Sequence, residues 1–458
     1  MATKDMEKLI AHAKGEGFVY QGSEIYDGLA NTWDYGPMGV QLKNNIKNLW
    51  WKRFVQECPY NVGIDSAIFM NPRVWQASGH VGNFNDPLID CKQCKSRHRA
   101  DKLIEAYDPE LHPDGWTPEE MMTFIREHNI ACPECGGHDF TDIRQFELMF
   151  ETSMGVVKDA KSKIYLRPET AQGIFVKLQV MFREHHVRNY HLVLDRLVNH
   201  SVTKSLQVTS FSRTREFEQM ELEFFTKPNE DLEWFEKWRH DCMQFLYDLG
   251  INKENLRYRD HDQKELSFYS KATTDIEYLY PFGWGELWGI ADRTDYDLGR
   301  HQEYSKKNLE YLDPDTHEKY LPYVIEPSVG ADRLFLSVLA NAFEEQELEN
   351  GDVRKVMHFH PALAPVKVAV LPLTKKQSDE AMELYNDLVK DFYCEYDQAG
   401  QIGKRYRRQD AIGTPLCVTV DFDTAEDHSV TVRDRDTMEQ IRLPIDQLKA
   451  YIADKNTF

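Results

Sequence analysis

The stretch Glu326-Pro-Ser-Val-Gly-Ala-Asp-Arg-Leu-Phe-Leu-Ser-Val-Leu339 joins small residues to a strongly apolar run that follows an arginine. The apolar spacing after Arg333 predicts a buried helix, and the preceding residues predict a strand that ends at Gly330. Gly330 permits close approach of a ligand to the backbone. An arginine in the first turn of a helix is well placed to hold a polyphosphate, because a helix N-terminus favours negative charge. A packed strand and helix with incidental charges is the alternative.

Three further strings combine charge with strand or helix patterns. RTREFEQMELEFF (213–225) has two arginines on a turn before alternating glutamates and apolar residues, so a strand is expected over 216–226. YLRPETAQGIFV (165–176) lies in a predicted strand, turn and helix over 164–176, with Arg167 and Glu169 just beyond the strand. GWGELWGIADR (283–293) reads as a packed strand. Arginines beside several carboxylates suit recognition of phosphate and ammonium groups, although each string alone also fits paired ions on a sheet.

Composition narrows the class of protein. The 458 residues carry a formal net charge of −21, which argues against a protein that coats nucleic acid indiscriminately. RNA binding would need a local basic patch, for which GKRYRRQD (403–410) is the candidate, with a solvated charged loop as the alternative. No apolar run is long enough to span a membrane, and the first residues lack the apolar core of a signal peptide. The protein is therefore predicted to be cytoplasmic.

Four of the eight cysteines form two CxxC pairs, Cys91 with Cys94 and Cys132 with Cys135. Four thiolates on two tight loops can close a tetrahedral zinc site, and the glycines after Cys135 allow the sharp turn that such a loop needs. The gap between the pairs is long, but a helix over 118–128 could occupy it. A vestigial knuckle without metal is the alternative.

Patterning predicts two domains. Residues 39–57 have helical apolar spacing, 61–70 alternate like a strand that Pro72 ends, and about 88–150 form a polar inserted module. Residues 351–365 are expected to be a linker between a first domain over 1–350 and a second over 366–458. The second domain begins with the apolar run VKVAVLPL, continues with a helix over 377–392 and two strands, and closes with a helix, which predicts a compact α/β domain with a mixed sheet.

In their order along the chain, these strings are similar to glycyl-tRNA synthetases of the homodimeric, class II type. EGFVYQGSEIYDGLANTWDYGPMGV (16–40), NPRVWQASGHV (71–81) and YRRQDAIGTPLCVTVD (406–421) extend the resemblance over nearly the whole chain. It implies an α/β (α+β) fold in which an antiparallel-sheet catalytic core is followed by a C-terminal anticodon-binding domain. It also implies a homodimer whose interface includes 39–72.

The resemblance further implies a glycine–tRNA ligase. Glycine attacks the α-phosphate of ATP to give glycyl-adenylate and pyrophosphate, and the glycyl group then passes to the 3′ end of tRNA(Gly). Mg²⁺ accompanies ATP, and chemistry of this kind depends on positioning and charge neutralisation. The implied catalytic residues are Arg333, Glu286 and Arg215. The implied ATP-binding residues are Val202, Thr203, Lys204, Ser212, Arg213, Thr214, Arg215, Glu216, Phe217, Glu286, Leu287, Gly330, Ala331, Asp332 and Arg333. The implied glycine-binding residues are Arg99, Glu169, Phe217, Glu218, Gln219, Met220, Glu221, Glu326, Pro327, Ser328, Val329 and Gly330.

One stretch departs from the family pattern. Where the family has a motif like IGKSFRNEITPGNF, this chain has LVNHSVTKSLQVTS (197–210). Phe-Arg-Asn-Glu can be encoded TTC CGT AAC GAA, which read one base later gives Ser-Val-Thr-Lys, the residues at 201–204. The same shift turns Gly-Lys-Ser into the Val-Asn-His of 198–200. We therefore hypothesise that about 177–212 is out of frame, which places Val202 where an arginine should contact the ATP α-phosphate. A divergent insert is the alternative.

Three other functions remain to be weighed against a glycine–tRNA ligase. A catalytically impaired synthetase-like protein that binds tRNA would explain the lost arginine but leaves Arg333, Glu286 and the carboxylates unexplained. A class II ligase for a larger amino acid would need a roomier pocket with fewer carboxylates than Glu169, Glu221 and Glu326 supply. A zinc-dependent RNA-binding module would not explain why phosphate-binding and carboxylate strings occur together.

Overall fold

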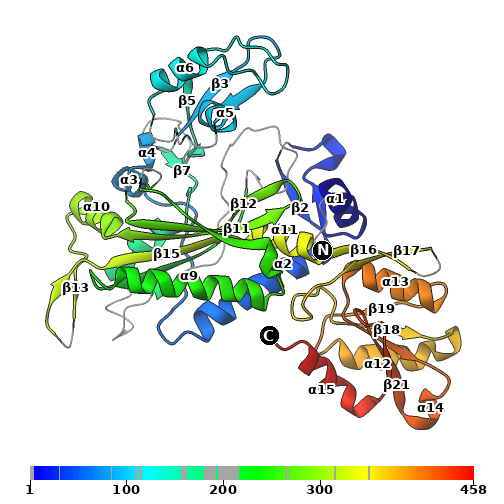
Figure 1. Ribbon diagram of the computed structural model, residues 1–458. Coiled ribbons are helices and arrows are strands. Elements are labelled where there is room, and N and C mark those ends of the chain that lie inside the picture. Colours follow the sequence, from blue (N-terminus) through cyan, green and yellow to red (C-terminus); the bar gives the residue numbers. More distant parts are fainter. Residues whose placement is uncertain are drawn as a thin grey trace.

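The computed structural model describes residues 5–29, 31–83, 85–108, 111, 113, 116–155, 162–179, 192–193, 216–263, 266–267, 269–313, 316–348 and 351–458. A large twisted sheet with helices beneath it forms the centre, a small module stands above the sheet, and a separate α/β domain ends the chain (Figure 1). Within the described part of the chain, no helix is long and apolar enough to cross a membrane.

The central sheet has six strands in the order β10-β11-β12-β15-β9-β8, and all neighbours are antiparallel. Its strands are β8 (Leu192–Val193), β9 (Gln219–Thr226), β10 (Leu256–Asp260), β11 (Ala272–Tyr280), β12 (Gly283–Thr294) and β15 (Tyr323–Gly330). The strands predicted over 216–226 and up to Gly330 are thus confirmed as β9 and β15, and the string GWGELWGIADR forms β12.

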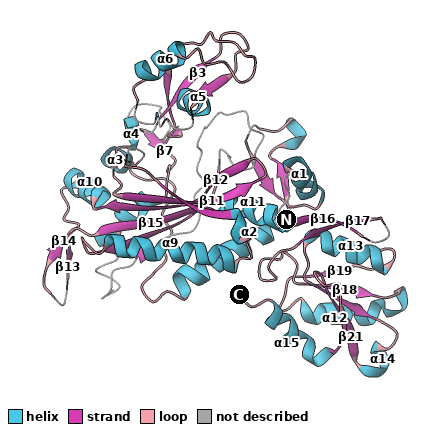
Figure 2. Cartoon of the chain, in the orientation of Figure 1, coloured by secondary structure: helices cyan, strands magenta, loops and turns pink. Residues whose placement is uncertain are grey.

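Alternation along β9 explains why this sheet has two different faces. Met220, Leu222 and Phe224 enter the main apolar core, whereas Glu221 and Glu223 lie between them in sequence and point to the opposite face. The core face is covered by α2 (Pro37–Trp51), α9 (Asp231–Asp248) and α11 (Ala331–Ala342), which Figure 2 shows beneath the strands. The other face receives the short helices α7 (Ala171–Phe175) and α10 (Tyr296–Ser305).

The inserted module is a small unit with its own apolar core. β3 (Asn85–Asp90) is flanked by β4 (Arg97–Arg99) and β5 (Arg144–Glu147), and α5 (Ala100–Tyr107) and α6 (Pro118–Glu127) pack together. The predicted helix between the cysteine pairs is confirmed as α6, whose N-cap Thr117 and Glu120 form a capping box.

The C-terminal domain has the predicted mixed sheet, in the order β19-β18-β20-β21-β22. β18 (Val368–Pro372), β19 (Cys394–Tyr396) and β20 (Leu416–Val420) are parallel, while β21 (Ser429–Asp434) and β22 (Gln440–Pro444) are antiparallel additions. The predicted helices are α12 (Ser378–Leu388) and the closing α15 (Ile445–Lys455), and α13 (Ile402–Ile412) is a third long helix that the sequence reading did not predict.

Two predictions of local structure were wrong. Residues 61–70 form no named strand and make only one bridge, from Phe69 to Leu166, and Pro72 begins the helix α3 (Pro72–Ala77). The expected linker is partly a strand, β17 (Val353–Met357), which pairs with β16 (Phe343–Glu347). This hairpin lies between the two domains in Figure 1, so the connection is structured.

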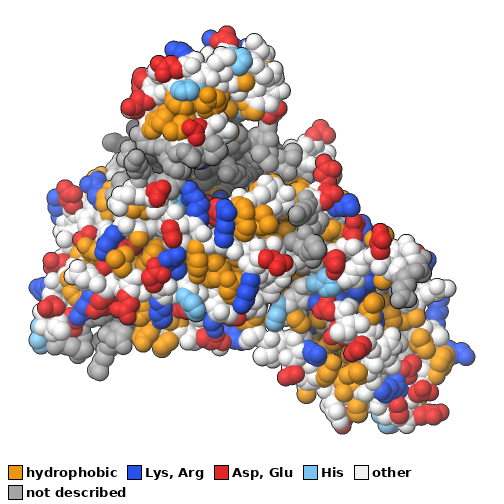
Figure 3. All heavy atoms as spheres, in the orientation of Figure 1, with side chains coloured by type: hydrophobic (Ala, Val, Ile, Leu, Met, Phe, Trp, Pro, Cys, Tyr) orange, Lys and Arg blue, Asp and Glu red, His pale blue; other side chains and the backbone are white. Residues whose placement is uncertain are grey.

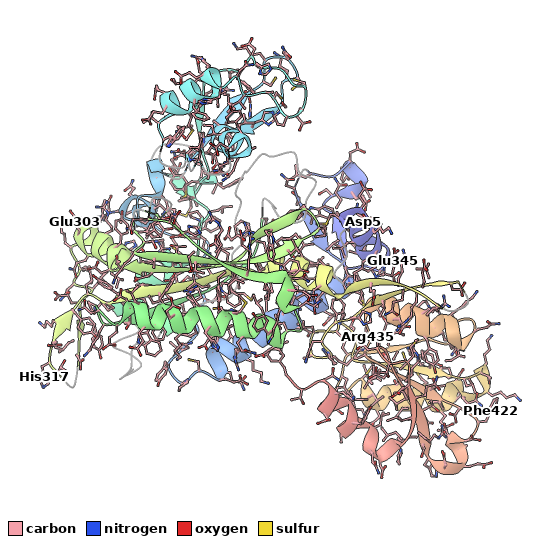
Figure 4. All side chains as sticks on the ribbon, viewed as in Figure 1. Asp5, Glu303, His317, Glu345, Phe422 and Arg435 are labelled. Atoms are coloured by element: carbon pink, nitrogen blue, oxygen red, sulfur yellow. The ribbon has the colours of Figure 1, made fainter. Side chains whose placement is uncertain are left out.

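The basic patch predicted at 403–410 is largely a structural element of α13. Arg405 is buried and donates to the carbonyl of Gly400, and Arg407 and Arg408 form ion pairs. Asp410 is buried between Arg354 and Arg433, with N–O distances of 2.8 Å to each. Most of these cations are therefore compensated within the protein. The face in Figure 3 shows acidic and basic side chains interspersed over this domain.

Candidate active site

A cluster of buried carboxyls lies on the sheet face opposite the main core. Glu221 and Glu223 come from β9 and Glu326 from the adjacent β15, and one carboxyl oxygen of each lies within 4.8 Å of the other two. Ser328 pairs with Glu221 across the strands, and its hydroxyl accepts a hydrogen bond from Gln219 at 3.3 Å.

The loop after the predicted RPET strand brings a fourth carboxyl to the cluster. Glu169 accepts a hydrogen bond from Gln172 at 2.6 Å and lies 3.5 Å from His80 Nε2. Thr170 donates its hydroxyl to Glu221. Arg167, predicted with Glu169 as a ligand-facing residue, is buried and donates to the carbonyl of Ser66 at 2.6 Å. The RPET segment thus supplies one pocket carboxylate and one structural arginine.

Arg293 is the principal buried cation of this cluster. It is 3% exposed and holds Glu326 at 2.5 Å and Asp297 at 2.8 Å. Its guanidinium carbon also lies 4.4 Å from the ring centre of Tyr269, within the range of a cation–π contact. Arg293 therefore links β12, β15 and α10 around the carboxyls.

Burial and mutual repulsion shift the acidity of these groups. Burial raises the pKa of both Glu221 and Glu223, and the charge of Glu326 raises them further. Burial also raises the pKa of Glu326, although Arg293 opposes the rise. Burial alone would raise the pKa of Glu169 as well, but the charge and hydrogen bond of His80 hold it below its ordinary value. The pKa of Glu169 is thus lowered, whereas the pKa values of Glu221, Glu223 and Glu326 are raised.

A second charged group lies at the start of α11. Arg333 forms an ion pair with Glu286 at 3.0 Å, and its guanidinium also donates to the Glu286 carbonyl at 3.3 Å. The charge of Glu286 raises the pKa of Arg333, so its positive charge is secure. Glu286 is about half exposed, with 51% of its side-chain surface accessible. Arg333 thus lies in the first turn of a helix, as the sequence predicted, and it forms an ion pair with Glu286.

Several residues in the predicted site strings support the fold instead of facing the pocket. Asp332 accepts from the backbone N–H of Glu218 at 2.7 Å and from Lys43 of α2 at 2.9 Å, while Glu218 pairs with Lys47 at 2.8 Å. These contacts fasten α2 to the strand ends. The residues of the strings that are buried toward apolar neighbours are Met220, Leu287, Pro327, Val329 and Ala331.

Arg99 forms ion pairs within the inserted module. Its partners there include Asp86 at 3.0 Å and Asp101. Glu216 and Phe217 immediately precede β9, and Phe217 is half-buried. Most of the segment hypothesised to be out of frame lies outside the described part of the chain. Seven of the implied ATP-binding residues also lie outside it: Val202, Thr203, Lys204, Ser212, Arg213, Thr214 and Arg215.

The four cysteines of the inserted module converge as predicted. Their sulfurs all lie within 4.8 Å of one another, with 3.6 Å between Cys91 and Cys135 and 3.7 Å between Cys94 and Cys132. Tetrahedral zinc with bonds of about 2.3 Å places its sulfurs about 3.8 Å apart, so the spacing fits that ion. Hydrogen bonds from Ser96 lower the pKa of Cys94 to about 6, which favours the thiolate form that binds metal.

The sequence reading missed Arg293, His80, Asp297 and Tyr269. Arg293 ends the string GWGELWGIADR, which was singled out for Glu286, and its place two residues beyond the apolar run was the available signal. His80 belongs to the short helix α4 (His80–Asn83), far from the sheet strings in sequence, and Asp297 belongs to α10, which begins just after β12. Only the fold brings them against Glu169 and Arg293.

Comparison with known proteins supports the arrangement. Residues 367–455 match the anticodon binding domain family. The chain is 60% identical over 460 residues to the glycine–tRNA ligase of Acetivibrio thermocellus, with 99% of each chain covered. It is 59% identical over 458 residues to that of Geobacillus kaustophilus, again with 99% of each covered. The chain belongs to the glycine–tRNA ligase family.

This family assignment confirms the predicted resemblance to glycyl-tRNA synthetases and the class II fold, while the homodimeric type stays a prediction. Among solved structures, prolyl-tRNA synthetase from Cryptosporidium parvum complexed with L-proline and AMP has a TM-score of 0.60 over 97% of this chain and 76% of that chain. The sequence identity is 14%, so this likeness concerns the fold alone. This chain thus has the predicted fold, an antiparallel-sheet core followed by a C-terminal α/β domain.

Proposed function

We propose that this chain activates glycine with ATP and transfers it to the 3′ end of tRNA(Gly). The observation that supports the proposal is the group of buried carboxyls on the sheet: Glu221 and Glu326 lie within 4.8 Å of each other, and Thr170, next to Glu169, donates to Glu221. The Arg333–Glu286 pair joins β12 to the helix that follows β15. Carboxylates attract an ammonium group and at the same time fill the space that a side chain would need. Glycine alone among the amino acids lacks that side chain.

The roles of the remaining groups follow from their chemistry. Arg333, at the start of α11, would hold the γ-phosphate of ATP, and Glu286 would bind the Mg²⁺ ions that accompany it. Phe217 would stack on adenine, with Arg213 and Arg215 on the phosphates. The glycine carboxylate then attacks the α-phosphate in line, and pyrophosphate leaves. The protein supplies orientation and charge neutralisation in this step.

Partners follow from the C-terminal domain and from α2. The domain that matches the anticodon binding family would contact the anticodon of tRNA(Gly). The long helix α2 would contribute to a homodimer interface over 39–72, and sedimentation of the purified chain at twice the monomer mass would support that state. A cytoplasmic location remains a prediction.

Zinc is proposed for the cysteine site because the sulfur spacing fits a tetrahedral ion. Cys91 and Cys132 are buried while Cys94 and Cys135 are exposed, so the ion would tie the two loops at the edge of the module. Its role is structural, because four protein ligands leave no open coordination position for a substrate.

The test is glycine-dependent ATP–pyrophosphate exchange, measured on this chain and on a version with Phe-Arg-Asn-Glu restored in frame. Loss of the arginine replaced by Val202 removes a charge contact worth about 1.5–3 kcal/mol in a hydrogen bond to a charged group. Exchange by the restored version alone would support both the activity and the out-of-frame hypothesis. Exchange by both would refute the importance of that arginine. Silence from both folded proteins would instead favour the alternative, a catalytically impaired tRNA-binding protein.

A further inference from the structure

Glu223 occupies an unusual position for a carboxyl group. It is 0% exposed, it lies in the middle of β9, and neither of its oxygens has a hydrogen-bond donor among the residues that the structure describes. A buried carboxylate with no donor would cost several kcal/mol in effective desolvation. Glu223 was not among the residues that the sequence pattern assigned to glycine.

The neighbours of Glu223 increase that cost. Its carboxyl lies within 4.8 Å of those of Glu221 and Glu326 and within hydrogen-bonding reach of Glu326. Two carboxylates so close cannot both remain ionised in a dry site, because like charges raise each other's pKa. At least one of the pair must carry a proton.

The hydrogen-bond donors near each carboxyl decide which carboxyl carries the proton. Glu326 is held at 2.5 Å by Arg293, and Glu221 accepts the hydroxyl of Thr170. Glu169 accepts a hydrogen bond from Gln172 and forms an ion pair with His80. These three carboxyls therefore have groups that stabilise an ionised form, and Glu223 is the member of the cluster without one among the described residues.

The charge balance points the same way. The charged and titratable groups that face the cluster come from every element around it: Glu169 from the loop before α7, His80 from the short helix α4 (His80–Asn83), Glu221 and Glu223 from β9, Tyr269 from the segment before β11, Arg293 from β12, Asp297 and His301 from α10 and Glu326 from β15. Five of these are carboxyls, whereas Arg293 and His80 are the cations that the described structure places against them. One ammonium from glycine would still leave an excess of negative charge if all five were ionised.

We propose that Glu223 is a neutral carboxylic acid that donates its proton in a hydrogen bond to Glu326, and that it thereby positions the Glu326 carboxylate for the glycine ammonium. Glu326 then receives Arg293 on one oxygen and the Glu223 hydroxyl on its other side. The carboxylate is held in one orientation and keeps its charge for the ligand. Glu223 acts through Glu326 and is a positioning residue. Its role in glycine binding rests on the proposed function, but the proton itself does not.

Two isosteric variants separate a neutral acid from an ionised one. Glu223→Gln keeps an N–H donor toward Glu326 and changes no charge if Glu223 is protonated, so the affinity for glycine in isothermal titration calorimetry should stay within about threefold of the parent. Glu326→Gln is the matched control, because it removes a charge that faces the ammonium and should weaken binding about tenfold or more. A fall in affinity for Glu223→Gln as large as that for Glu326→Gln would overturn the proposal.

Infrared spectroscopy tests the proton without any ligand. The folded parent chain should show a carboxylic-acid C=O stretching band that persists at pH 8, and Glu223→Gln should lack it. If that variant does not fold, the band of the parent is compared before and after unfolding in urea, since it should vanish when the carboxyl reaches water. Absence of the band from the folded parent at pH 8 would overturn the proposal. Failure of the parent to bind glycine, with the band present, would count against the proposed function only.

Discussion

Replacing Arg293 by methionine tests how the carboxyl cluster is held together. The substitution keeps most of the side-chain volume but removes the cation that Glu326 and Asp297 contact at 2.5 and 2.8 Å. Breaking a buried ion pair by removing one partner costs about 3–5 kcal/mol, because the other charge is left uncompensated. We expect a loss of this size in the free energy of unfolding of the catalytic domain.

The assay is urea unfolding followed by tryptophan fluorescence, since Trp288 on β12 is 1% exposed and reports on this sheet. Arg407→Met is the matched control. Arg407 pairs with Asp352 at the surface, where both side chains are about half exposed, and such pairs contribute about 0–1 kcal/mol. The two variants remove the same chemical group from a buried and an exposed site.

The loss of unfolding free energy in Arg293→Met should also depend on pH. Without the guanidinium, the folded-state pKa of Glu326 rises further above its unfolded value, so the cost of ionising it in the folded state grows as pH rises. The deficit of Arg293→Met should therefore be smaller at pH 5 than at pH 8. A loss below about 1 kcal/mol, no larger than that of Arg407→Met, would refute the reasoning that Arg293 compensates buried carboxylates.

Three other outcomes follow from the structure. The purified chain should contain one zinc ion, measured by plasma emission spectroscopy. Cys94→Ser should lose this ion, whereas the control Cys394→Ser, in the C-terminal sheet, should keep it. Equal zinc content in the two variants would exclude zinc binding by the four cysteines of the inserted module. Asp410→Asn should lower the thermal stability of the C-terminal domain by about 3–5 kcal/mol, because it leaves two buried arginines uncompensated; an unchanged melting temperature would contradict this. Burial lowers the pKa of Lys367 to about 7 from 10.5, so between these pH values the unfolded chain binds more protons and the free energy of unfolding should rise with pH. Lys367→Met should flatten that rise in denaturant titrations from pH 7 to 10. An unaltered slope would show that Lys367 keeps its charge in the folded protein.

Residue patterning predicted the elements whose two faces differ. The alternation in β9, the apolar run of α11 and the two CxxC loops each carry their structure in their own residues, because burial of one face requires that spacing. The same logic failed over 61–70, where alternation exists without a neighbouring strand to pair with apart from one bridge at Phe69. A strand depends on its partners, and these are remote in sequence.

The candidate site was predictable where its charges sit on the strands themselves. Glu221, Glu326, Arg333 and Glu286 were named because the resemblance to the family implied them, and the structure brings Glu221 close to Glu326 and Arg333 close to Glu286. Arg293 was within a quoted string but had no reason to be chosen, since its partner Asp297 comes from α10 and Glu326 from β15. For the basic run at 403–410, the sequence did not show that carboxylates and carbonyls of the same domain bind several of its arginines. Its contact with RNA stays a prediction.

The most direct test of the account is charging of a tRNA(Gly) transcript with radiolabelled glycine by the version of this chain in which Phe-Arg-Asn-Glu is restored. The account predicts ATP-dependent glycyl-tRNA, with no product from labelled alanine and none when Glu326→Gln is introduced. Charging with alanine at a comparable rate, or none with glycine from a folded, zinc-loaded protein, would contradict the claim that these carboxyls form a glycine site.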